Sequence, residues 1–298
     1  MSNFEYFSIE LDRHNSFYLS GENLKGSIKI KLTEKEKINS IKVYLNGGAY
    51  VKWNGTLKGG GGGYATEKYV DSIVTLLSKL DNSDLYLQDK EYNFDFEFLL
   101  PHDLPSSFES SIGQIRYFLT AVIEREWMYD KKVKLNLSVK SVLDLNKNPV
   151  LRQGYGVCEQ KEICCGPCKS DSIVADFSTK KCGFVLGEQV EFKVKIQNRS
   201  NRKINHTKVA LRQNIVYHAD HNKTWITDDI QSVFFQSSIQ PLENMAWENG
   251  DIQIPLLAQT LTGRIIEITY SLVLSFKASA SLSKNIAIPI VVGLIPFN

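Results

Sequence analysis

The residues with the clearest chemical potential in this sequence are its five cysteines. Cys165 and Cys168 have the Cys-x-x-Cys spacing of half a zinc site, and Cys164, Cys182 and Cys158 lie nearby in the sequence. A structural zinc ion takes four ligands, but no second Cys-x-x-Cys or histidine pair follows at a suitable distance. We therefore predict reduced thiols and no metal site. Cys164, Cys165, Cys168 and Cys182 are the candidates that this prediction sets aside.

Two other patterns with chemical potential have plainer interpretations. His218 and His221 are three residues apart after a predicted strand, which is typical of an exposed polar turn. The glycine run 59–63 lacks the Gly-Lys-Ser/Thr of a phosphate-binding loop and indicates a hairpin linker. The sequence contains no serine-hydrolase, zinc-protease or kinase motif set. We therefore expect a protein without catalytic residues or cofactor, which is not an enzyme.

One charged residue stands inside a predicted strand. Arg116 lies within Ile115–Leu119, between apolar neighbours. An arginine that alternates with apolar residues usually faces solvent, but in a sandwich with a polar interior layer it would pair with a buried carboxylate. Both orientations stay open at this point, and our hypothesis for the inward one is a buried ion pair between Arg116 and Asp144.

Composition limits the classes of protein that the chain can belong to. Its 298 residues are enough for two domains, and 43% hydrophobic residues are enough for ordinary cores. A net charge of +2 gives no general attraction for nucleic acid, so we expect no nucleic-acid partner. The longest apolar run, Ile286–Phe297, is too short to span a bilayer and contains two prolines. Acidic residues interrupt the first 14 positions, so we expect no signal peptide, no transmembrane segment and a cytoplasmic location.

Hydrophobic periodicity predicts the fold class. Apolar residues alternate with polar ones in several segments: Ile28–Leu32, Phe94–Phe98, Val190–Ile196 and Ile266–Phe276. No long segment has apolar residues at helical spacing, so no substantial amphipathic helix is predicted. Short strands separated by Gly, Asn, Asp and Pro indicate an all-β protein of antiparallel, immunoglobulin-like sandwiches.

An internal repeat predicts that there are two such sandwiches in tandem. Phe17–Leu24, with Gly21-Glu22, returns as Phe184–Val190, with Gly187-Glu188, and each leads into an alternating strand. A second pair of anchors recurs in the same order: Leu100-Pro101 before Ile115–Leu119, and Ile254-Pro255 before Ile268–Leu272. The stretch between the two copies is rich in Asn, Gly and Pro. We therefore predict domains at 1–144 and 170–298, joined by a linker at 145–169.

Several segments together carry a family resemblance. The most specific is Leu104–Glu109 followed by Gly113–Tyr117. The others are Gly21-Glu22 with Gly26, Ile41–Gly47, Ala49–Trp53, Phe94–Pro101, Trp127, Asp144–Asn146, Cys164-Cys165 with Cys168, Gly183–Glu188 and Pro289–Pro296. Taken together, these segments resemble the α-arrestins, the arrestin-domain-containing proteins, over nearly the whole chain.

This resemblance implies arrestin N- and C-domains and a scaffold that binds cytosolic tails of membrane receptors or transporters. It implies roles in endocytosis, endosomal sorting and ubiquitylation, with peripheral association to the plasma membrane or endosomes. Relatives that recruit ubiquitin ligases usually carry Pro-Pro-x-Tyr motifs beyond the C-domain, whereas this chain has eight prolines and no adjacent pair. Either the ligase is reached through another arrestin, or that function is lost, or a longer form carries the motif.

Two alternative functions remain open at this point. One is an endosomal coat subunit resembling the retromer arrestin-like subunit, which would bind a constant partner over a large surface. The other is a receptor-desensitising arrestin that binds phosphates, which requires a concentrated basic face. Candidates for that face are Lys131-Lys132, Lys180-Lys181 and Arg199–Lys203.

Overall fold

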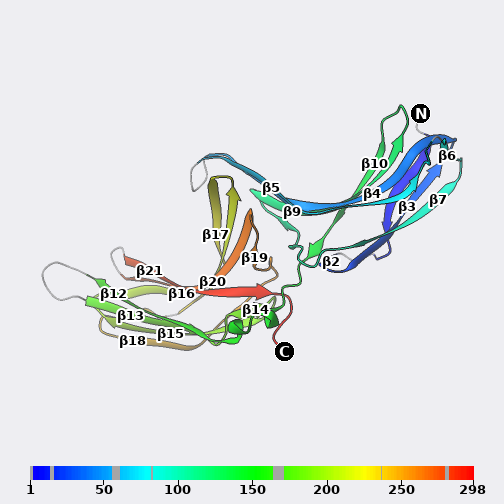
Figure 1. Cartoon of the computed structure of the whole chain (residues 1–298). Coiled ribbons are helices and arrows are strands. Elements are labelled where there is room, and N and C mark those ends of the chain that lie inside the picture. Colours follow the sequence, from blue (N-terminus) through cyan, green and yellow to red (C-terminus); the bar gives the residue numbers. More distant parts are fainter. Residues whose placement is uncertain are drawn as a thin grey trace. The chain divides into compact units, whose positions relative to one another are not determined.

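A computed structural model describes residues 3–13, 17–55, 61–81, 83–163, 171–235, 237–278 and 282–298 (Figure 1). The chain forms two compact units. The first comprises Met1–Val142 together with Tyr217–Lys223, and the second comprises Leu143–Val216 and Thr224–Asn298. Both consist of strands, and the described residues contain only two short 3₁₀ helices. No helix among the described residues has the length and apolar character needed to cross a bilayer.

The first part of the chain contributes eleven strands. They are β1 (Phe4–Leu11), β2 (Tyr18–Leu19), β3 (Asn23–Leu32), β4 (Glu36–Trp53), β5 (Gly63–Ser78), β6 (Leu85–Leu87), β7 (Glu91–Leu99), β8 (Phe108–Glu109), β9 (Gly113–Arg125), β10 (Lys131–Leu137) and β11 (Val139–Lys140). One sheet has the order β1-β3-β7, and a second has the order β10-β9-β4-β5, with β6 on β4 and β8 on β9.

Alternating sequence explains how these two sheets make a core. Ile28 pairs with Phe94 across β3 and β7, and Leu45 pairs with Leu119 across β4 and β9. Ile28, Leu45 and Leu119 have no exposed surface, while their neighbours along each strand are partly or fully exposed. Residues two apart on a strand face the same side, so each sheet buries one face and presents the other to solvent.

The rest of the chain repeats this plan. Its elements are η1 (Leu145–Lys147), η2 (Pro149–Arg152), β12 (Tyr155–Ile163), β13 (Asp171–Thr179), β14 (Gly183–Val185), β15 (Gln189–Arg199), β16 (Ile204–Ala219), β17 (Asn222–Phe234), β18 (Asn244–Gln253), β19 (Leu261–Thr262), β20 (Ile266–Ala278) and β21 (Leu282–Gly293). One sheet has the order β12-β13-β15-β18, and the other has the order β14-β21-β20-β16-β17, with β19 on β20. The predicted fold class, all-β with tandem sandwiches, is confirmed.

The internal repeat is confirmed in atomic detail. Gly21 and Gly187 both have φ +83°, a conformation that favours glycine. The glutamate after each glycine accepts a hydrogen bond at 2.9 Å from the backbone N–H three residues earlier, at Leu19 and Val185. In each unit the backbone of the turn also pairs with the second anchor of the repeat, Leu100-Pro101 or Ile254-Pro255. The two anchors therefore recur together because they are hydrogen-bonded to each other.

A tyrosine completes each copy of the repeat. Tyr117 on β9 and Tyr270 on β20 are both buried, and each hydroxyl donates to a backbone carbonyl twelve residues earlier, at 2.8 Å to Pro105 and 2.6 Å to Ala258. Burial raises the pKa of Tyr270 to about 12, so this hydroxyl stays protonated and able to donate at neutral pH. Each tyrosine fixes the loop that precedes its strand.

The segment predicted as a linker contains regular structure. Residues 145–152 form η1 and η2, and Tyr155–Ile163 forms the edge strand β12, which pairs with β13 from Tyr155↔Thr179 to Ile163↔Asp171. Glycine at 154 allows this pairing, because a Cβ there would lie 2.7 Å from the Thr179 carbonyl oxygen, and glycine in a strand marks such close backbone approaches. The composition signal used for the linker therefore marks short helical turns and a sheet edge.

Candidate functional site

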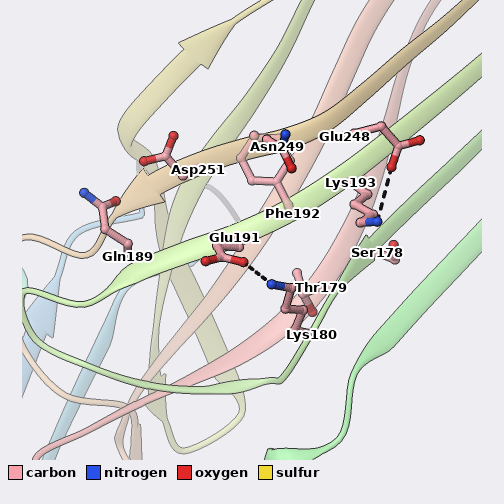
Figure 2. Close-up of a pocket in the computed structure, with 11 residues that line it drawn as sticks. Ser178, Thr179, Lys180, Gln189, Glu191, Phe192, Lys193, Glu248, Asn249 and Asp251 are labelled. Carbon is pink, nitrogen blue, oxygen red and sulfur yellow. Dashed lines mark hydrogen bonds and ion pairs between the residues drawn. The ribbon is translucent and has the colours of Figure 1, made fainter.

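A hollow of about 550 Å³ lies on the outer face of the β13-β15-β18 sheet (Figure 2). Its walls carry charges of both signs: Lys180 pairs with Glu191, and Lys193 donates to Glu248 at 3.2 Å. These lysines hold the pKa values of Glu191 and Glu248 below their usual range, so both carboxylates are ionised at neutral pH. A polar peptide could therefore bind in the hollow by forming ion pairs with these lysines and glutamates in place of the exposed pairs between them.

The sheet bends beside this hollow because β15 and β18 lose register between Phe192 and Val194. Gly250 lies opposite, and a Cβ there would overlap the Phe192 ring. The bulge therefore depends on glycine at position 250, and a bulge of this kind bends a strand and redirects the side chains next to it. In the sequence, the only signal for this surface is the Asn-Gly pair at 249–250.

A second hollow, of about 460 Å³, lies on the outer face of the β10-β9-β4-β5 sheet. It surrounds another bulge, at Gly47 and Gly48, where the register of β4 and β5 shifts. Amide side chains line it, contributed by Asn46, Gln114 and Asn136. Amides both donate and accept hydrogen bonds, so this surface suits the backbone of an extended peptide.

The predicted buried ion pair between Arg116 and Asp144 is wrong. Arg116 lies on the solvent face of β9, is 57% exposed, and forms a two-bond fork with Glu109 at 2.6 and 2.9 Å. Asp144 caps η1, where its carboxylate accepts from the backbone and side-chain nitrogens of Asn146, both at 2.9 Å. These two hydrogen bonds hold the pKa of Asp144 below its usual range. Parity along β9 decides the outcome for Arg116, because the buried residues Ile115 and Tyr117 flank it.

Asn146 is a structural residue that the sequence analysis assigned only to a family segment. Besides its bonds to Asp144, its side-chain nitrogen donates to the Pro296 carbonyl at 2.8 Å. Its side-chain oxygen accepts from Arg152 at 2.7 Å and from the backbone of Asn298 at 3.1 Å. Asn146 therefore ties residues 296–298 to η1 and η2 within the second unit.

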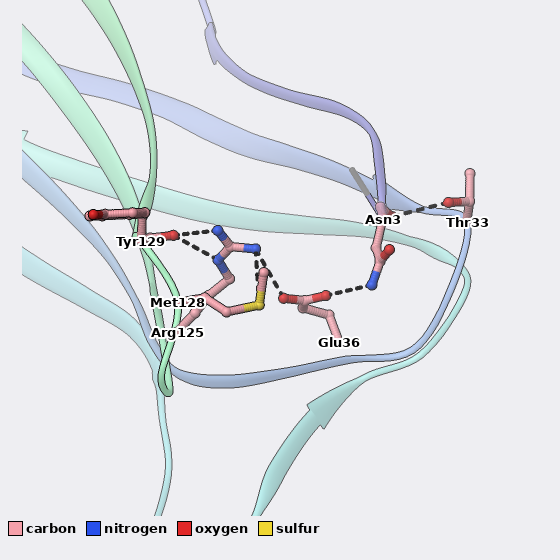
Figure 3. A network of polar contacts seen from close by, with 6 residues as sticks. All are labelled: Asn3, Thr33, Glu36, Arg125, Met128 and Tyr129. Carbon is pink, nitrogen blue, oxygen red and sulfur yellow. Dashed lines mark hydrogen bonds and ion pairs between the residues drawn. The ribbon is translucent and has the colours of Figure 1, made fainter. Parts of the chain in front are cut away.

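The buried ion pair of the first unit joins Glu36 and Arg125 (Figure 3). Their side chains are 7% and 9% exposed, and the Arg125 guanidinium lies 3.2 Å from a Glu36 oxygen. The other Glu36 oxygen accepts from Asn3 at 2.8 Å, and two Arg125 nitrogens donate to the Tyr129 carbonyl. The sequence held a signal for this pair: Arg125 continues the odd-numbered buried phase of β9, and Glu36 is in phase with buried Ile38 on β4.

Some of the cysteines considered as metal ligands lie outside the described residues. Cys164, Cys165 and Cys168 are outside them, whereas Cys182 is half-buried and Cys158 is exposed. Burial raises the pKa of the Cys182 thiol, and a hydrogen bond with Asp176 raises that of Cys158, so both are thiols at neutral pH. In the part of the chain that the structure describes, no three His, Cys, Asp or Glu side chains gather as a metal site would require.

Comparison with known protein families finds a match for each half of the chain. The N-terminal domain family described as arrestin (or S-antigen) matches residues 7–146, and the corresponding C-terminal domain family matches residues 169–297. The chain belongs to the arrestin family. The resemblance to arrestin-domain-containing proteins is thus confirmed.

Relatives of this arrestin-family chain carry matching names. It is 26% identical over 316 residues to arrestin domain-containing protein 17 of Caenorhabditis elegans, with 99% of this chain and 72% of the relative covered. It is 28% identical to arrestin domain-containing protein 1 of Rattus norvegicus, covering 100% and 66%, and 25% identical to arrestin domain-containing protein 4 of Mus musculus, covering 96% and 71%. The chain thus spans about two thirds to three quarters of the length of these relatives.

Proposed function

We propose that this arrestin-family chain is a non-enzymatic adaptor in the trafficking of membrane receptors or transporters. The observation that carries the proposal is the match of both arrestin domains along the chain, supported by relatives named as arrestin domain-containing proteins. In this proposal the adaptor binds the cytosolic tail of a membrane protein and links it to endosomal sorting or ubiquitylation machinery. The 298 residues contain no Pro-Pro-x-Tyr motif, so in this proposal a ubiquitin ligase is reached through a second arrestin or through a motif outside these residues.

The hollow beside Gly250 is the surface that we assign to the cargo tail. Its volume of about 550 Å³ exceeds the 460 Å³ of the hollow on the other unit, and it presents ionised carboxylates and lysines side by side. A tail with charges of either sign can replace one partner of the exposed pairs at little cost, because such pairs contribute little stability in water. Binding there depends on shape and on sets of charges, as an adaptor with several cargoes requires.

Phosphate recognition receives less support from the basic clusters. Lys180 and Lys181, candidates for a basic face, pair with Glu191 and Glu188, and Lys132 lies 3.6 Å from Asp130. Each of these lysines stands beside a carboxylate, so their charge is balanced locally and does not form the concentrated positive surface that phosphate recognition needs. We therefore favour the adaptor over a receptor-desensitising arrestin.

Affinity capture from cells, followed by binding of purified tails, tests this function. The chain should capture membrane proteins with cytosolic tails, or endosomal coat or ubiquitin-ligase components, and a purified tail should bind it directly. Ser178→Trp, which fills the hollow, should weaken tail binding at least tenfold. Asn244→Trp, at an exposed position on β18 of the same sheet but outside the hollow, should not. Capture without any such protein would refute the adaptor function, and equal loss in both variants would refute the assigned surface.

A further inference from the structure

Three consecutive apolar side chains stand in solvent at the loop that joins β9 to β10. Trp127 is 97% exposed, Met128 is 60% exposed and Tyr129 is 94% exposed. Large aromatic residues usually lose most of their surface on folding, and scattered single exceptions need no explanation. Three adjacent exposed apolar side chains at the end of a hairpin do need an explanation. We call Trp127, Met128 and Tyr129 the aromatic tip.

The backbone of the aromatic tip is held from below by the buried ion pair. Two nitrogens of Arg125 donate to the Tyr129 carbonyl, while the third lies against Glu36, whose side chain is nearly inaccessible. Figure 3 shows the Tyr129 ring directed away from this network. The carbonyl of Tyr129 is therefore fixed to the core of the sandwich, while the Trp127 and Tyr129 side chains remain almost fully exposed among the described residues.

Trp127 adopts φ +59°, in the left-handed region that tryptophan rarely occupies. A non-glycine residue in this conformation costs about 1 kcal/mol or more, and such strain persists where surrounding contacts impose it. The strained conformation of Trp127 indicates that the loop is held in one conformation. A loop that is already ordered loses little conformational entropy when its side chains enter a new environment.

We propose that the aromatic tip inserts into the headgroup region of a lipid bilayer. Tryptophan and tyrosine combine an apolar body with one polar N–H or O–H, and this combination favours the membrane interface. The tip is the end of a hairpin, and lysines 131, 132 and 134 follow it on the edge strand β10, which places positive charge beside the rings. Lys132 also lies 3.6 Å from Asp130, and the Lys134 ammonium lies 3.4 Å from the centre of the Phe118 ring. This inference does not rest on the adaptor function, since lipid binding needs no cargo.

The net charge near the aromatic tip predicts how strongly vesicle binding should depend on the content of anionic lipid. The charge of Arg125 is paired with Glu36 in the core, so residues 126–134 set the charge near the tip: three lysines and two acidic residues, a surplus of one positive charge (3 − 2 = +1). Each positive charge near an anionic surface strengthens binding by about fivefold, so anionic lipid should strengthen binding by about fivefold. Burying the rings contributes about ten- to a hundredfold each, so binding to neutral vesicles should also be measurable.

The experiment is co-sedimentation of the full chain with large vesicles of phosphatidylcholine, with and without 30% phosphatidylserine. The test variant is Trp127→Asn with Tyr129→Asn, because asparagine tolerates the left-handed conformation and the backbone carbonyl at position 129 is retained. The matched control is Leu80→Ser with Leu256→Ser, two side chains of comparable exposure, 78% and 88%, on other loops. Circular dichroism and thermal melting establish that each variant is folded.

The wild type and the control should bind both vesicles, and the test variant should bind at least tenfold more weakly. Independently of any variant, brominated lipid should quench the wild-type tryptophan fluorescence, since Trp127 is the most exposed of the tryptophans at 53, 127, 225 and 247. Failure of the wild type to bind vesicles overturns the proposal, as does unchanged binding by the test variant. Vesicle binding that survives while the variant loses a purified protein partner would assign the tip to that partner instead.

Discussion

Replacing Glu36 by glutamine probes the buried pair that supports the β9–β10 loop. Glutamine keeps the size of the side chain and still offers one oxygen to Arg125. It removes the negative charge, and its amide nitrogen then faces the Asn3 side-chain nitrogen, which donates to Glu36 at 2.8 Å in the wild type. The Arg125 guanidinium, with its side chain 9% exposed, is left as an uncompensated charge.

The magnitude follows from this burial. Removing one partner of a buried ion pair costs about 3–5 kcal/mol, because the other charge remains away from water. Arg125 keeps its two bonds to the Tyr129 carbonyl, which places the expected loss at about 3 kcal/mol, the lower end. For a unit of this size, 1 kcal/mol corresponds to about 3 °C, so the melting temperature should fall by about 10 °C.

Scanning calorimetry and urea unfolding of the full chain measure this loss. The matched control is Glu109→Gln, which breaks the two-bond pair with Arg116, in which both side chains are 57% exposed. Its melting temperature should change by no more than about 2 °C, since solvent already screens this pair. Combining Glu36→Gln with Arg125→Met should cost less than the sum of the two single changes, because the double variant leaves no buried charge.

A single result would refute this reasoning. If Glu36→Gln melts within the same narrow range as Glu109→Gln, then burial does not set the energy of these pairs, and Arg125 is not a charge that depends on its partner. The same result would weaken the account of the aromatic tip as a loop held by the core.

Three further predictions concern other parts of the structure. Gly187→Ala should lower the free energy of unfolding by about 1 kcal/mol, because alanine is strained at a φ of +83°. Gly21→Ala should lower it by about 2–4 kcal/mol, because the new methyl group also overlaps the His102 ring. Equal losses for the two variants in urea unfolding would contradict this. A hydrogen bond from Arg212 lowers the pKa of Asp229 below its ordinary 3.8, so this carboxylate stabilises the fold above that pH and loses its contribution as pH falls through the lowered pKa. Asp229→Asn should therefore reduce stability at pH 7 and flatten the loss below about pH 4 in acid titrations, and an unchanged acid profile would count against the assignment. Asn146→Ala should speed hydrogen exchange at residues 294–298 and cost about 1–3 kcal/mol, since four hydrogen bonds are lost; unchanged exchange would show that other contacts hold this segment.

The strands and their duplication were predictable because they depend on local pattern. Period-two alternation identifies β3, β7, β15 and β20, since a strand must present its apolar residues to one side. The Gly-Glu turns were recognisable because only glycine readily adopts φ +83°, so the residue type itself carries the conformation. The strand β12 was not predicted, because the glycines and prolines in and near it are typical of loops. Its pairing with β13 nevertheless holds this segment as an edge strand.

Pairings between charges were not predictable in the same way. Alternation along β9 was enough to place Arg116 in solvent and Arg125 inside, but no local rule names Glu36, which is 89 residues away from Arg125, as the partner. The hollows beside Gly250 and Gly47 arise from register shifts between strands, which depend on how each strand aligns with its neighbour.

Chain order, residue type and periodicity therefore account for the two all-β domains, for the paired glycine turns and for the family. These features act over a few residues, where steric limits and the alternation of side chains leave few choices. The Glu36–Arg125 ion pair, the cap at Asp144 and the exposure of the rings of Trp127 and Tyr129 were decided only when distant strands came together. Their energies depend on burial and on partners, and neither exists until the sandwich has formed.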